Sequence, residues 1–71
     1  MLRNLRAEMS RNEITIEQIS THLGVRYMTV CDKINGKYEF RISEALKIRQ
    51  KFFPNCTIEY LFDRGDHVIS A

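Results

Sequence analysis

The sequence has few of the residues that cross-link a chain or break its helices. It holds no tryptophan, one proline, three glycines and two cysteines among 71 residues. Cys31 and Cys56 are too few for a disulfide scaffold, and they lack the C-x-x-C or Cys/His spacing of a zinc site. We therefore expect two reduced thiols in a cytosolic protein, with no metal and no other cofactor. A domain this small without such supports often relies on oligomerisation.

Long apolar runs and catalytic motifs are also lacking. No stretch approaches the ~20 apolar residues of a membrane span, and the N-terminal MLRNLRAEMSRNE has no apolar region of a signal peptide. There is no Gly-rich phosphate loop, and His22 and His67 stand alone in the sequence. A chain of this length leaves little room for a substrate pocket. We expect neither an enzyme nor a membrane protein, and no small-molecule substrate.

The net charge of +2 is small but unevenly distributed. Residues 1–25 carry three positive and three negative charges, which sum to zero, whereas residues 26–51 carry seven positive and three negative, which sum to +4. Residues 52–71 carry one positive and three negative charges, which sum to −2. The basic middle segment suits a polyanionic partner, but a solvated helix surface has the same composition. Charge alone leaves both interpretations open.

Helical periodicity predicts an all-α fold with a domain over residues 1–62. The five expected helices cover about residues 2–12, 15–23, 26–34, 43–53 and 58–62. We expect Ser43 and Thr57 to cap the last two, and Pro54 to end the fourth. Residues 63–71 form a C-terminal tail, for which a flexible terminus and a strand pairing with a partner chain are both open.

The spacing of apolar residues also predicts which side chains are buried. On the first helix, Glu8 is expected at the surface, opposite the apolar stripe. We expect Phe40 and Ile42 to fold back onto the core. The predicted apolar face of the fourth helix consists of Ala45, Leu46, Ile48, Phe52 and Phe53, and its solvent face of Lys47, Arg49 and Lys51.

Residues 15–36 contain the strongest motif in the chain. Thr15-x-x-Gln18 is a capping box, Gly24 suits a left-handed turn, and Asn35-Gly36 ends the next helix. Two short helices joined by a three-residue turn with glycine first have the spacing of a helix-turn-helix, whose second helix enters a DNA major groove. The positions expected to fix the angle between the helices are Ile19, Ser20, Leu23, Gly24, Val25, Val30 and Ile34.

Four segments resemble a known family. QISTHLGV, KINGKYEF, SEALKIRQKFFP and TIEYLF are similar to segments of phage Cro/cI-type regulators, also called lambda-repressor-like or XRE. The resemblance covers residues 2 to 62 and is greatest to small Cro-like proteins of temperate phages of Gram-positive bacteria, some of which are modulators of repression. It implies a compact five-helix domain that binds operator DNA in the bacterial cytoplasm and regulates a lysis/lysogeny switch.

By position, the resemblance places Tyr27, Met28 and Asp32 where base edges are read, and Asn35 and Lys37 where phosphates are held. The DNA-binding interpretation adds contacts of Arg26, Lys33, Tyr38 and Arg41 with the DNA backbone, helped by Thr29, limited base readout, and a dimer on a two-fold operator. Because Ile16 stands where a phosphate-binding glutamine is usual, Gln18 or Thr15 would replace it. The complete predicted surface consists of Gln18, Arg26, Tyr27, Met28, Thr29, Cys31, Asp32, Lys33, Asn35, Lys37, Tyr38 and Arg41.

An alternative follows from the same residues. Tyr27 and Met28 offer few groups that read bases, but an aromatic ring beside an adaptable thioether is typical of a protein interface. Asp32 would repel phosphate and would suit a basic partner. The chain would then be a modulator or antirepressor that binds a phage repressor protein as a heterodimer and alters its DNA binding. A third interpretation places Tyr27 and Met28 partly buried against the first helix or the linker.

Overall fold

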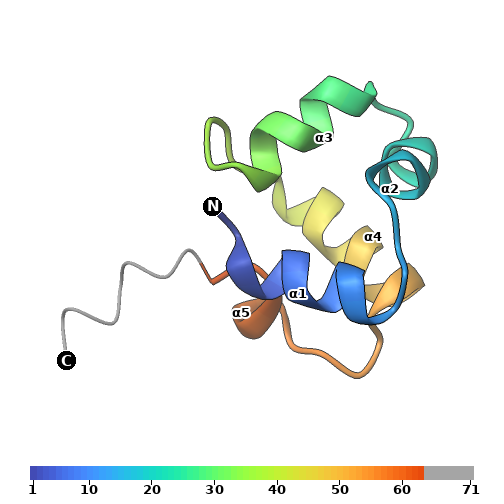
Figure 1. Cartoon of the computed structure of the whole chain (residues 1–71), viewed down its shortest axis with the longest axis vertical. Coiled ribbons are helices and arrows are strands. Elements are labelled where there is room, and N and C mark those ends of the chain that lie inside the picture. The colour runs from blue at the N-terminus through green and yellow to red at the C-terminus, as the bar shows by residue number, and fades with distance from the viewer. Residues whose placement is uncertain (64–71) are drawn as a thin grey trace, which may run out of the picture.

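The computed structural model describes residues 1–63 of the chain (Figure 1). Within that range there are five helices and no strand, which confirms the predicted all-α class. The helices are α1 (Arg3–Arg11), α2 (Ile16–Leu23), α3 (Tyr27–Ile34), α4 (Ile42–Phe52) and α5 (Ile58–Leu61). The predicted tail lies outside the described residues, apart from Asp63.

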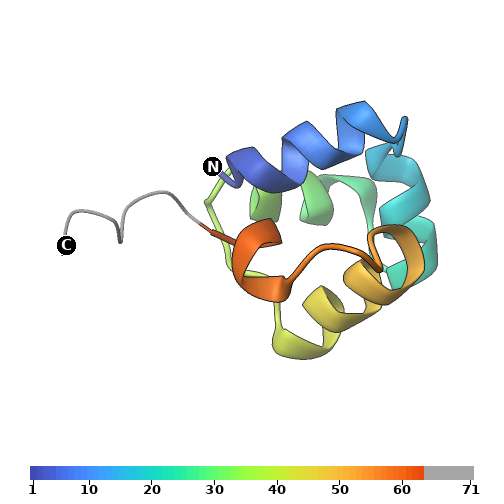
Figure 2. The same ribbon diagram turned by 90° about the horizontal axis from the view of Figure 1, so that it is seen from below.

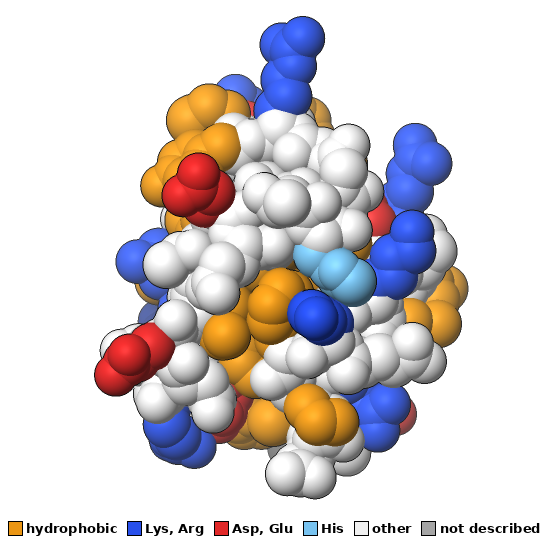
Figure 3. Space-filling view, turned by 90° about the vertical axis from the view of Figure 1, so that its right-hand side faces the viewer, with side chains coloured by type: hydrophobic (Ala, Val, Ile, Leu, Met, Phe, Trp, Pro, Cys, Tyr) orange, Lys and Arg blue, Asp and Glu red, His pale blue; other side chains and the backbone are white. Residues whose placement is uncertain are grey.

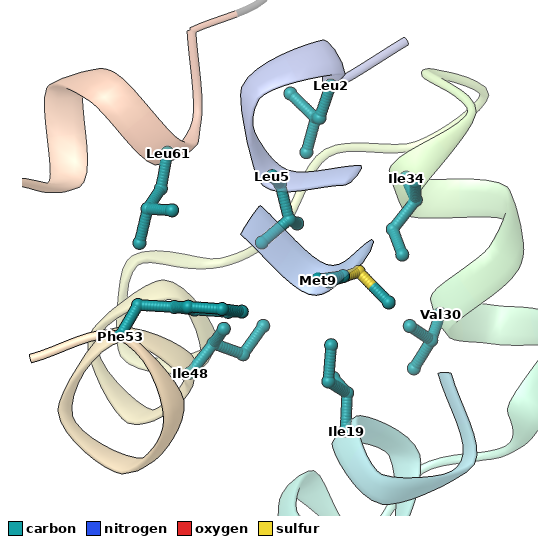
Figure 4. Packing of buried hydrophobic residues seen from close by; sticks show 9 residues of the cluster. All are labelled: Leu2, Leu5, Met9, Ile19, Val30, Ile34, Ile48, Phe53 and Leu61. Atoms are coloured by element: carbon teal, nitrogen blue, oxygen red, sulfur yellow. The ribbon is translucent and has the colours of Figure 1, made fainter. Parts of the chain in front are cut away.

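All five helices pack around one small apolar core. α2 contacts both α3 and α4, and α5 contacts both α1 and α4. Figure 2 shows α5 between α1 and α4, so the last helix closes the side of the core that α2 and α3 leave open. The core side chains converge from every helix or its flanking residue (Figure 4): Leu2, Leu5, Met9, Ile19, Val30, Ile34, Ile48, Phe53 and Leu61. None of the helices in residues 1–63 is both long and apolar enough to cross a membrane.

The first three helices end in the same backbone arrangement. In each, a residue with positive φ follows the helix, and the next N–H reaches back to a carbonyl in the last turn, which is the Schellman motif. The three residues are Glu13 (φ 57°), Gly24 (φ 72°) and Gly36 (φ 92°). The returning bonds run from Ile14 N to Met9 O (2.8 Å), Val25 N to Ser20 O (3.1 Å) and Lys37 N to Asp32 O (2.9 Å). The predicted ends of all three helices are therefore confirmed.

The start of α4 differs from the prediction. Ser43 is not the cap: the helix begins at Ile42, and the backbone N–H of Arg41 donates to Glu44 Oε1 at 2.9 Å. Ile42 and Leu46 are one turn apart on a face that turns away from the buried Ala45. Their side chains are 80% and 41% exposed, so the prediction that both are buried is wrong.

Glu8 is also placed differently from the prediction. The residue is 6% exposed rather than at the surface. Its Oε2 accepts hydrogen bonds from Tyr60 Oη at 2.9 Å and from Arg11 Nη1 at 2.8 Å. Because these donors satisfy the buried carboxylate, Glu8 links α1 to α5 instead of destabilising the core.

Phe40 packs against the core as predicted. Its ring meets the Phe62 ring edge-on, with centroids 5.5 Å apart, a favoured arrangement for two aromatic side chains. This contact fixes the loop between α3 and α4 against the end of the described chain.

Candidate interaction surface

The turn between α2 and α3 leaves the start of α3 without a side-chain cap. Gly24, Val25 and Arg26 connect the two helices, and Arg26 occupies the cap position in an extended conformation. Within residues 1–63, no side chain accepts a hydrogen bond from the first N–H groups of α3. Such unpaired donors, together with the positive end of the helix dipole, favour an anionic group nearby.

The first turn of α3 presents two large side chains to solvent. Tyr27 is 52% exposed and Met28 is 62% exposed. The interpretation that buries them against the first helix or the linker is therefore wrong. Val30 and Ile34 on the opposite face are buried, as predicted. Thr29, Cys31 and Asp32 are half-buried, so only part of each side chain is open to a partner.

A second group of predicted site residues follows the end of α3. Asn35, Lys37, Tyr38 and Arg41 are all exposed. Lys37 Nζ lies 5.6 Å from the centroid of the Tyr38 ring, so the two side chains share one part of the loop. The backbone carbonyl of Asp32 accepts from the N–H groups of Lys37 at 2.9 Å and Tyr38 at 3.4 Å, which ties this loop to the helix.

The structure corrects the placement of Lys33. Its Nζ lies 2.7 Å from Glu44 Oε1, and the two side chains are 13% and 15% exposed. Lys33 therefore links α3 to α4 and is not available for the predicted contact with phosphate. Burial raises the pKa of Glu44, but the hydrogen bonds from Lys33 and from the Arg41 N–H outweigh it, so that this pKa lies below its usual value.

Gln18 completes the predicted capping box of α2. Its Oε1 accepts from the Thr15 N–H at 2.7 Å, and its own N–H donates to Thr15 Oγ1 at 3.1 Å. The side-chain oxygen is therefore used inside the protein. The NH2 group of this exposed side chain remains the part that can donate to a phosphate at the start of α2.

The exposed site residues around α3 thus fall into two groups at the two ends of the helix. Arg26, Tyr27 and Met28 lie at its start, and the Lys37–Arg41 loop follows its end (Figure 1). α3 has eight residues and is therefore about 12 Å long. Gln18 lies apart from both, at the start of α2.

The face formed by α2 and the end of α4 carries both charged and apolar side chains. Basic and acidic side chains both project around its rim, the acidic ones mainly on the left, whereas apolar side chains gather near its centre (Figure 3). A shallow depression there is lined by Gln18, His22 and Phe52, among others. His22 stands edge-on to the Phe52 ring with centroids 5.7 Å apart, which gives it a packing role at the surface. In residues 1–63 no cluster of three metal-binding side chains occurs.

Sequence reasoning missed two bonds between side chains of different helices. The partners in Lys33–Glu44 are 11 residues apart, and those in Glu8–Tyr60 are 52 apart. No local spacing rule pairs residues across different helices, so the sequence contained no signal for either bridge.

A search with this chain against protein-family models, curated proteins and solved structures finds no match. The resemblance to Cro/cI-type regulators therefore stays a prediction.

Proposed function

We propose that the chain is a phage-type transcription regulator that acts in the bacterial cytoplasm and binds operator DNA through α2 and α3. The observation that carries this proposal is the start of α3: an uncapped helix end with Arg26 beside it and with Tyr27 and Met28 exposed. In this proposal α2 and α3 form a helix-turn-helix, and the exposed face of α3 lies in the major groove.

The exposed cations at both ends of α3 support contacts with the DNA backbone. Arg26 precedes the helix, and Lys37 and Arg41 follow it. Because α3 between them is about 12 Å long, these side chains can meet phosphates on the two sides of the groove that the helix enters. These contacts would set the orientation of the protein without reading sequence.

Base readout in this proposal is limited and mainly apolar. The Tyr27 hydroxyl can donate or accept one hydrogen bond, and Met28 can contact a thymine methyl group. Asp32 is half-buried and could accept from a cytosine amino group. Specificity would therefore depend on pairing two copies on a two-fold operator.

A second function is favoured by the exposure of the same two side chains. An exposed tyrosine beside an exposed methionine, at 52% and 62%, has the composition of the centre of a protein interface. The natural partner is a DNA-binding repressor of the same phage, whose DNA-facing surface is basic and would suit Asp32. Binding there would block the operator contacts of the repressor.

A gel-shift experiment separates the two functions. The protein is incubated with the DNA upstream of its own gene, first alone and then with the neighbouring repressor. A shift with the protein alone, weakened by salt and by Lys37→Ala but not by Lys47→Ala on α4, is expected for direct binding. No shift alone, together with loss of the repressor's shift, would reject DNA binding and support the second function.

The repressor-directed function makes its own prediction about Met28. If Met28 anchors that interface, Met28→Asp should weaken the complex by more than ~1 kcal/mol, the usual threshold for a significant interface residue. Isothermal titration calorimetry with the purified repressor measures this change. Gln50→Asp, an exposed substitution on α4, is the matched control. Equal affinities for the two variants would reject Met28 as an anchor.

A further inference from the structure

An apolar pocket of about 200 Å³ lies beyond the end of α3, away from Tyr27 and Met28. Four parts of the chain surround it: the N-terminus, the loop after α3, the start of α4, and α5 with Phe62. Most of its walls are carbon, with contributions from Leu2, Phe40, Ile42, Ala45, Ile58 and Phe62. Lys33 at its wall is already paired with Glu44, so covering the pocket leaves this lysine with its partner. The pocket is therefore suited to apolar side chains.

Two exposed side chains at this pocket also favour a cover. Ile42 is 80% exposed and Tyr38 is 56% exposed, although both line the pocket. Removing apolar surface from water is favourable in proportion to the area covered. An apolar segment that fills the pocket would therefore also shield part of these two side chains.

We propose that Val68 and Ile69 of the same chain occupy this pocket. These two residues lie outside the described part of the chain, and they are the large apolar residues of the segment 64–71, RGDHVISA. The segment begins close to the pocket, because Phe62 lines the pocket and Asp63 is the last described residue. The six residues that lead from Phe62 to Val68 can span up to about 20 Å, which is ample for a return to the pocket.

The covalent link favours this segment over a separate partner. A tethered segment binds at a high effective concentration when its linker can reach the site. It also loses less translational and rotational freedom on binding than a separate molecule does. Even a weak preference of Val68 and Ile69 for the pocket would therefore keep the pocket filled within one chain.

The docked segment would also affect the loop after α3. Lys37 and Arg41 are exposed, and each is flanked on both sides by residues that line the pocket. Asp66 lies two residues before Val68, so docking would bring a carboxylate near these cations, to which it is attracted. The consequence for DNA rests on the proposed function: the carboxylate would compete with phosphate for Lys37 and Arg41 and weaken DNA binding. The docking itself does not depend on DNA.

Methyl NMR spectroscopy of the full chain tests the docking. We expect nuclear Overhauser contacts from the methyl groups of Val68 and Ile69 to the Ala45 methyl group at the pocket wall. The double variant Val68→Asp/Ile69→Asp should shift the Ala45 methyl signal, because charged side chains are unfavourable in an apolar pocket. The matched control is Ser70→Asp/Ala71→Asp, which adds the same charge to the same segment outside the apolar pair and should leave the Ala45 signal unchanged.

Three results would each overturn the proposal. The first is the absence of these contacts in the parent chain, and the second is an Ala45 signal that the double variant leaves unchanged. The third is found by mixing isotope-labelled and unlabelled chains. Contacts that occur only between two different chains would mean that the segment fills the pocket of a second copy instead of its own.

Fluorescence anisotropy with a single operator half-site tests the consequence for DNA. If the segment is docked in at least about half of the molecules, releasing it should tighten binding about twofold or more. Val68→Asp/Ile69→Asp should therefore bind more tightly than the control of equal charge. Equal affinities would reject the competition with phosphate and keep the docking. The NMR contacts in a chain that binds no DNA would reject the proposed function and likewise keep the docking.

Discussion

At the scale of single residues, Glu13 occupies a position that suits glycine. Glu13, Gly24 and Gly36 have the same role at the ends of α1, α2 and α3, yet only Glu13 carries a side chain in the left-handed region, at φ 57°. The sequence signals Gly24 and Gly36 by their residue type. It gives no such signal for Glu13, because a glutamate rarely adopts this conformation. The Ile14 N–H bond to Met9 O nevertheless holds it there.

Replacing Glu13 with glycine should stabilise the protein. Relief of the left-handed strain contributes about 1–2 kcal/mol, and the greater freedom of glycine in the unfolded chain offsets about 0.4–1 kcal/mol of it. Urea unfolding should therefore show a higher midpoint for Glu13→Gly. A lower midpoint would mean that the Glu13 side chain makes stabilising contacts that outweigh its strain.

The reverse substitutions provide the comparison. Gly24→Ala should destabilise by about 1 kcal/mol through the backbone alone, because a Cβ there meets no atom within 4 Å. Gly36→Ala should cost more, since its Cβ would also lie 3.2 Å from the backbone nitrogen of Met1. Equal losses in urea unfolding would show that the N-terminal segment moves aside freely.

Glu44 should make stability depend on pH. Its pKa in the folded protein is below the ordinary value of 4.5, because the bonds from Lys33 and the Arg41 N–H outweigh the effect of burial. The stabilisation is therefore present above about pH 4.5 and is lost as the pH falls through the lower folded pKa. Glu44→Gln should have a lower urea midpoint than the parent at pH 7, and this difference should shrink in acid. An equal difference at both pH values would contradict the role of the charge.

At the scale of the elements, local sequence signals predict the positions of the five helices well, but they place the start of α4 wrongly. Thr15 and Thr57 cap α2 and α5 as predicted, by accepting from Gln18 N and Tyr60 N. Ser43 has the same chemistry, but the chain uses Glu44 to bind the Arg41 N–H and begins α4 at Ile42. Ser43 and Glu44 are neighbouring capping signals, and of the two Glu44 also pairs with Lys33 on α3.

This difference between caps can be measured directly. Thr15→Ala removes the acceptor for the Gln18 N–H and should cost about 1 kcal/mol of stability. Ser43→Ala removes a hydroxyl that caps no helix and should change stability by less than about 0.5 kcal/mol. Urea unfolding of the two variants gives both values. A Ser43→Ala loss as large as that of Thr15→Ala would mean that Ser43 caps α4 after all.

At the scale of the whole molecule, the sequence predicts the class of fold better than it predicts the surface. Apolar periodicity identifies core residues such as Val30 and Ile34, because burial repeats with the helix. It misplaces Glu8, Lys33 and Ile42, because their surroundings depend on elements distant in the sequence. The seven positive charges in residues 26–51 therefore overstate the cations that a partner can meet, because Lys33 is paired with Glu44.

Lys33 and Lys37 test the difference between a cation that is paired inside the protein and one that a partner can meet. Lys37 is exposed, whereas Lys33 is engaged by Glu44. If the protein binds DNA, Lys37→Gln should reduce the slope of log affinity against log salt by about 1, since one fewer phosphate is neutralised. Lys33→Gln should leave the slope unchanged and lower the urea midpoint, because Glu44 loses its partner. Fluorescence anisotropy at several salt concentrations gives the slopes, and a smaller slope for Lys33→Gln than for Lys37→Gln would assign the DNA contact to Lys33.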